Sequence, residues 1–323
     1  MSLSYEFSIG SVRAKEKHLL GASDYEQMLA LKSESDLLGF LKDKGYPEGD
    51  SAEEMLSARQ EMMWKYIRSV APDMVIFEPF YMQNDIHNFK TILKGVMFGK
   101  DYEGLLLSPS NIACDVIKKC IEERRFDSLP QWLASAGEKA YELLAHTKDA
   151  RLSDGALDRA LMETLISISK KSKSLFLVKY FNNFAFYANI KIALRASKSK
   201  TTMEFLTTAL CGCDDFDKSK TIKMIMAGHE RLLKYLETVS AYDCKTAVKL
   251  YEERPGLFEK YADNRLLKIA REMCRYSNDG PEPLFGYYIG CEYERKAVNM
   301  IASGIRTAAS PDSIRERLRE TYG

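Results

Sequence analysis

Two carboxylates near the C-terminal end of the chain have the types and spacing for acid–base chemistry. Glu292 and Glu294 lie two residues apart, and Lys296 follows two residues further on. Paired carboxylates act as general acid and base only where a pocket holds both against a substrate. In a helix, Glu292 and Lys296 would stand four residues apart on one face and could form an ion pair, while Glu294 would project elsewhere. We interpret the three as structural positions and keep catalysis as an alternative.

Two other patterns are incomplete metal sites. The segment 229–233 begins like a zinc-peptidase helix at His229 but lacks the second histidine four residues later. Cys211 and Cys213 precede Asp214 and Asp215 and could hold a soft metal ion, but no second Cys or His pair follows at zinc-finger spacing. The sequence therefore favours loop cysteines and predicts no bound metal.

Motifs for nucleotide binding and nucleophilic catalysis are absent from the sequence. It has no GxxxxGK[ST] loop, no GxGxxG after a strand and no GxSxG elbow, and its four histidines are scattered. The basic residues of segment 118–125 flank Glu122 and Glu123, which is typical of a solvated helix face. We expect no catalytic residues, no cofactor and no nucleic-acid partner.

Three amphipathic segments, residues 81–94, 181–195 and 287–301, look like copies of one helix. The first two align with an offset of 101 residues (189 − 88). The aligned positions are Asn88 with Asn189, Lys90 with Lys191, and Lys94 with Arg195. Because Asn is a mediocre helix former, its recurrence suggests a side-chain hydrogen bond to a neighbouring turn or helix. The third copy has drifted, since it carries Ala297 and Asn299 where polar and basic residues are expected.

Helical periodicity extends over most of the chain. We expect helices over 25–43 with a break near Ser33, over 51–67 with a capping box at Ser51, over 109–125, from 153, over 222–239 without interruption, and from 311. Residues 74–77 are the best candidate for a strand. Turn signals fall in segments 99–104, 197–201, 211–215 and 278–283. The fold class is therefore all-α, with three similar helical domains expected over residues 1–107, 108–213 and 214–323.

Composition narrows the class of protein. The 323 residues are 46% hydrophobic, which is enough for a large core, and 47 basic against 46 acidic residues exclude overall attraction to nucleic acid or an anionic membrane. No run of eighteen apolar residues or secretion signal is present. Seven cysteines without disulfide spacing indicate reduced thiols. We expect a cytoplasmic location without membrane insertion.

Four stretches in this order resemble the C subunit of V-type and archaeal A-type ATPases and ATP synthases, whose eukaryotic relative is the d subunit. They are residues 11–16 (SVRAKE), 85–90 (DIHNFK), 189–195 (NIKIALR) and 280–296, which ends on the Glu292, Glu294 and Lys296 group. One departure is the sequence Ala297-Val298-Asn299, where the family usually has Asn-x-Arg.

The resemblance implies a non-catalytic rotor component with three helical domains around a pseudo-threefold axis. Such a protein forms a funnel-like socket between the D and F subunits of the central stalk and the membrane proteolipid ring. It serves proton or sodium transport linked to ATP synthesis or hydrolysis, at the junction of the cytoplasmic part with the ring. Two alternatives remain: a helical-repeat interaction scaffold unrelated to an ATPase, and an enzyme with a polar pocket near His229, Glu292 or Glu294.

Overall fold

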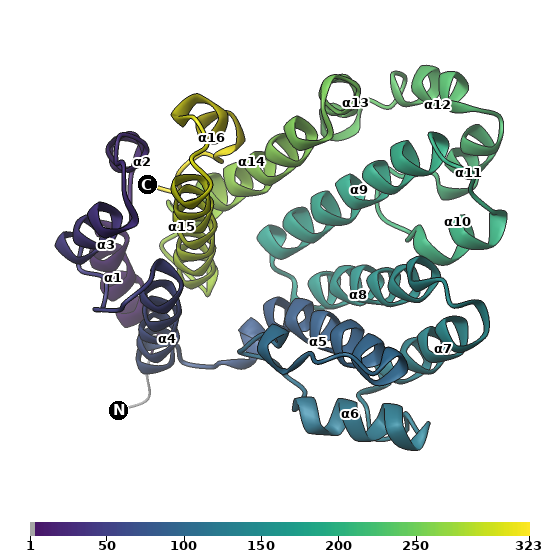
Figure 1. The fold of residues 1–323 in the computed structure, drawn as a ribbon, viewed down its shortest axis with the longest axis horizontal. Coiled ribbons are helices and arrows are strands. Elements are labelled where there is room, and N and C mark those ends of the chain that lie inside the picture. The colour runs from purple at the N-terminus through teal and green to yellow at the C-terminus, as the bar shows by residue number, and fades with distance from the viewer. Residues whose placement is uncertain (1–3) are drawn as a thin grey trace. The chain divides into compact units, whose positions relative to one another are not determined.

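The computed structural model describes residues 4–323, and over this range the chain is all-α, as predicted. The described residues form sixteen α-helices, three short 3-10 turns and a single isolated β-bridge between Cys213 and Phe216 (Figure 1). Among these helices none has the length and apolar character needed to cross a bilayer. The chain divides into two compact units. The terminal unit comprises residues 1–74 and 250–323, and the middle unit comprises residues 75–249. The prediction of three domains stays a prediction.

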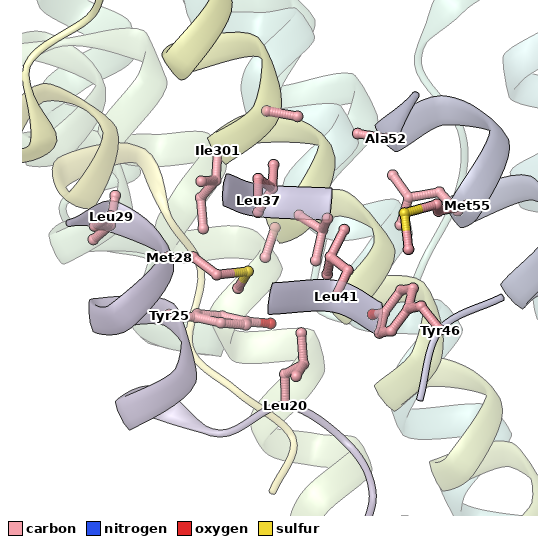
Figure 2. Packing of buried hydrophobic residues seen from close by; sticks show 14 of the residues in the cluster. Leu20, Tyr25, Met28, Leu29, Leu37, Leu41, Tyr46, Ala52, Met55 and Ile301 are labelled. Carbon is pink, nitrogen blue, oxygen red and sulfur yellow. The ribbon is translucent and has the colours of Figure 1, made fainter. Parts of the chain in front are cut away.

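Helices from both ends of the chain build the terminal unit. They are α1 (Tyr5–Glu16), α2 (Ala22–Leu29), α3 (Glu34–Asp43), α4 (Ala52–Val70), α14 (Pro255–Cys274), α15 (Glu282–Arg306) and α16 (Pro311–Arg317). The 25-residue α15 contacts α1, α4 and α14 and is the central helix of the unit. Figure 2 shows side chains of α2, α3 and α4 converging with Ile301 of α15, where Met28, Leu37 and Leu41 have no exposed surface.

Local signals set the starts of these helices. The expected break in segment 25–43 is present, because α2 ends at Leu29 and Ser33 caps α3 by accepting a hydrogen bond from the Asp36 N–H. At α4, Ser51 accepts from the Glu54 N–H at 3.2 Å, and the Glu54 carboxylate accepts from the Asp50 N–H at 2.9 Å. The two serine contacts satisfy backbone donors that the first helical turn leaves unpaired, and the Glu54 contact satisfies the N–H of the residue before the N-cap.

The middle unit contains α5 (Glu78–Phe98), α6 (Cys114–Glu123), α7 (Gln131–Thr147), α8 (Ala150–Ser172), α9 (Leu175–Ser197), α10 (Met203–Ala209), α11 (Lys218–Met226) and α12 (His229–Leu236). Helix α8 contacts α5, α7, α9 and α10 (Figure 1). Helix α9 is buried on most sides, and its Phe181 ring lies 5.7 Å from that of Phe80 in α5. One further helix, α13 (Cys244–Glu253), includes residues 249 and 250, between which the middle unit ends and the second part of the terminal unit begins.

Three sequence predictions were wrong at least in part. The helix expected over residues 109–125 begins only at Cys114 and ends at Glu123. The helix expected over residues 222–239 is two helices, α11 and α12, because Gly228 between them adopts φ = 112° and ψ = 160°. This backbone conformation is essentially restricted to glycine and cannot continue a helix. The strand expected over 74–77 is instead a 3-10 turn, Val75–Phe77, that leads directly into α5. The apolar run there buries Phe77 in a helical core rather than in a sheet.

Candidate functional site

Asn88 lies in the middle of α5 and holds the backbone of a segment that follows the helix. Its side chain is completely buried. The Nδ2 group donates to the Leu107 carbonyl at 2.9 Å, and Oδ1 accepts from the Leu107 N–H at 2.8 Å. One turn earlier, the buried Asp85 carboxylate accepts from the N–H groups of Asn111 and Ile112 at 2.8 and 3.0 Å. The two side chains therefore fix residues 107–112 against α5.

Asn189 makes the same pair of contacts in α9. Its Nδ2 donates to the Cys211 carbonyl at 3.0 Å, and its Oδ1 accepts from the Cys211 N–H at 3.1 Å. Asn182, two turns earlier, accepts from the Asp214 N–H at 3.0 Å. The two asparagines that the 101-residue offset aligns thus satisfy both backbone groups of one residue about twenty positions later. We call this arrangement the asparagine clamp.

In α15 the carboxylate of Glu294 holds the backbone of the loop that contains Leu20. Glu294 is 3% exposed, and it accepts from the Leu20 N–H and from the Tyr46 hydroxyl, both at 2.6 Å. Burial raises the pKa of this carboxyl above its usual value, against the lowering effect of these hydrogen bonds and of Arg59, whose Nη2 lies 3.9 Å away. An offset of 108 residues from Asn189 (297 − 189) instead leads to Ala297, so the polar contact of α15 lies nearly one turn before the position that the repeat indicates.

The basic positions of the first two copies lie in different surroundings. Lys90 pairs with Asp158, and Lys94 pairs with Asp154 at 2.7 Å, so that two ion pairs link α5 to α8. Lys191 and Arg195 instead lie on the exposed face of α9, where Arg195 borders a cavity of about 500 Å³. The repeat therefore preserves the asparagine contact more closely than the lysine contacts.

The carboxylates singled out for acid–base chemistry border too little space for a substrate. Glu292 pairs with Arg295 at 2.9 Å rather than with Lys296, whose ammonium group lies 5.2 Å from the centre of the Tyr293 ring. The cavity that Glu292 and Glu294 share has a volume of about 10 Å³, roughly the space for one water molecule. These residues are held by structural contacts.

The incomplete metal motifs also take part in structural contacts. His229 begins α12, and its Nδ1 lies 2.8 Å from the Ser197 hydroxyl. Cys211 is buried and packs against Met162, while Cys213 is partly exposed in the same loop. Within residues 4–323, no three side chains of His, Cys, Asp or Glu are grouped as metal ligands would be.

Comparison with known proteins identifies the family. The sequence profile of the ATP synthase (C/AC39) subunit family matches residues 8–317. The C subunit of the V-type sodium ATPase from Enterococcus hirae is 20% identical over 319 residues, which cover 96% of this chain and 97% of that protein. The C subunit of the A-type ATP synthase from Methanocaldococcus jannaschii is 23% identical over 345 residues, which cover 97% and 86%. Because the match spans almost the whole sequence, the chain belongs to the ATP synthase (C/AC39) subunit family.

Proposed function

We propose that this chain is the non-catalytic rotor adaptor of a V-type or A-type ATPase, coupling the D–F central stalk to the membrane proteolipid ring. The main support is membership of the ATP synthase (C/AC39) subunit family together with the names of the relatives, which are components of a V-type sodium ATPase and of an A-type ATP synthase. The adaptor would bind the D and F proteins of the stalk on one side and the ring on the other. It would sit at the cytoplasmic junction with the ring, held there by protein contacts.

The buried clamps fit the mechanical task of such an adaptor. Torque passes through a protein only if its loops and helices move as one body, and buried hydrogen bonds between helix and loop oppose local opening. Asn88, Asn189 and Glu294 supply such contacts in three long helices, α5, α9 and α15. We propose that these helices are the central elements of three similar domains around a pseudo-threefold axis, and that nucleotide chemistry resides in other subunits.

A binding assay tests this function. The purified chain is immobilised and mixed with the D–F stalk and the detergent-solubilised proteolipid ring from the same organism, at moderate salt. We expect both to be retained together, and bovine serum albumin immobilised at the same density to retain neither. Retention of neither component would contradict the proposal and favour a helical scaffold unrelated to an ATPase.

A further inference from the structure

The terminal unit contains a surface basin whose charged lining is entirely basic. The basin has a volume of about 230 Å³ and lies where the end of α1, the turn after α3, the middle of α4 and one residue of α15 meet. Its polar lining includes Lys15, His18, Lys44 and Arg59, and no carboxylate lines it. Its remaining walls are Gly45, Met62, Met63, Tyr66 and Tyr287.

Nearby acidic groups only partly balance this charge. Lys44 pairs with Asp24 at 2.7 Å, and Arg59 lies 3.9 Å from the buried Glu294 carboxyl. Lys15 and His18 form no ion pair with any residue in 4–323, and the Lys15 ammonium group lies 5.4 Å from the centre of the Tyr66 ring. Since the whole chain is close to neutral at +1, this concentration of positive charge is a local feature.

The size and chemistry of the basin favour a phosphate group over a single carboxylate. A phosphate carries up to about two negative charges and several acceptor oxygens, so it can receive hydrogen bonds from lysine, arginine and histidine donors together. A carboxylate has only two acceptor oxygens, so it offers fewer hydrogen-bond acceptors to the donors of Lys15, His18 and Arg59. The volume of about 230 Å³ is enough for a phosphate with a small organic substituent against the methionine and tyrosine walls.

We propose that this basin binds a phosphate group, either as free inorganic phosphate or as the phosphate of an anionic phospholipid headgroup. Lys15 and His18 would be the principal ligands because both are exposed on the basin rim without an ionic partner. Arg59 and Lys44 would add positive potential while keeping their contacts with Glu294 and Asp24. The proposal does not depend on the rotor function, because binding would be a property of the isolated chain.

The test compares the wild-type chain with the double variant Lys15→Gln/His18→Gln. The control variant Lys100→Gln/His146→Gln removes the same two residue types from exposed positions of the middle unit. Titration calorimetry measures inorganic phosphate binding, with chloride at equal ionic strength in the reference. Co-sedimentation measures binding to phosphatidylcholine vesicles with and without phosphatidylglycerol. All the substituted side chains are exposed, and circular dichroism will check that each variant is folded.

If the ligand is free phosphate, calorimetry should detect binding to the wild type. Lys15→Gln/His18→Gln should weaken this binding at least about tenfold, and the control variant should leave it unchanged. A headgroup as the ligand predicts binding only to vesicles that contain phosphatidylglycerol, with the same dependence on Lys15 and His18. The proposal is overturned if neither probe binds the wild type, or if the two variants behave alike. Loss of D–F stalk binding in the basin variant without any phosphate binding would also overturn it, and would assign the basin to an acidic segment of a partner.

Discussion

The Glu294 carboxylate in α15 accepts a hydrogen bond from the Leu20 N–H at 2.6 Å, across 274 residues of sequence. The same carboxylate accepts from the Tyr46 hydroxyl, so one buried side chain ties two N-terminal loops to a C-terminal helix. The terminal unit is discontinuous in sequence, and this contact is one of the polar links between its two parts.

Removing the Glu294 carboxylate should destabilise the terminal unit. Glu294→Ala leaves the buried Leu20 N–H and the Tyr46 hydroxyl without their acceptor and opens a cavity, which together cost about 2–5 kcal/mol. Glu294→Gln should cost less, because its carbonyl oxygen can still accept one hydrogen bond and its amide can donate to the tyrosine oxygen. Urea unfolding measures the free energy of unfolding of both variants. Equal losses of stability in the two variants would contradict this role of Glu294.

The pH dependence of stability should carry a signature of Glu294. Burial raises the pKa of this carboxyl in the folded chain above the value of 4.5 expected when it is exposed. Between these two pKa values the folded state binds more protons than the unfolded state, so the free energy of unfolding falls as pH rises through that window. Relative to Glu294→Gln, the wild type should therefore lose stability on going from pH 4.5 upward. If the stability of the wild type relative to Glu294→Gln stayed constant or rose with pH, the assignment would be wrong.

Both asparagine clamps should be sensitive to mutation. Asn88→Ala and Asn189→Ala each remove two hydrogen bonds to a loop backbone, which is part-buried at Leu107 and buried at Cys211. Each should therefore lower the free energy of unfolding, by about 1–4 kcal/mol, with the larger loss at Asn189. Asn299→Ala, at an exposed position of α15, is the control and should change it by less than about 0.5 kcal/mol. If only one clamp variant is destabilised, the two positions do not share a structural role.

The internal repeat predicts some of the buried polar contacts of this fold and misses others. The offset between Asn88 and Asn189 is visible in the sequence, because both positions are polar interruptions of an apolar helix. In the third segment the offset of 108 residues (297 − 189) leads to Ala297, whereas the buried polar contact is made by Glu294, three residues earlier. The partner of Glu294, Leu20, is 274 residues away, so no local pattern in the sequence marks the contact. The basin that Lys15 and Arg59 line could not be predicted from the sequence. The two residues lie on different helices, α1 and α4, and contacts between residues distant in sequence bring these helices together.

The helix break at Gly228 could not be predicted from hydrophobic periodicity either. Apolar residues keep helical spacing on both sides of it, so periodicity alone predicts one helix, while the backbone takes a φ of 112° that ends α11. Gly228→Ala should therefore cost about 1–3 kcal/mol, because a Cβ is strained in that conformation. Gly212→Ala is the matched control, since a Cβ there meets nothing within 4 Å and the backbone is not left-handed. Thermal unfolding compares the two, and equal melting temperatures would contradict the explanation of the helix break.

We propose that this chain couples ATP turnover to ion movement without taking part in the chemistry. The most direct measurement compares ATP hydrolysis and ATP-driven ion uptake in proteoliposomes that contain the complete ATPase or the ATPase assembled without this chain. We predict that hydrolysis by the catalytic part persists without the chain while ion uptake is lost, and that adding the purified chain back restores uptake. Undiminished ion uptake in its absence would contradict the account.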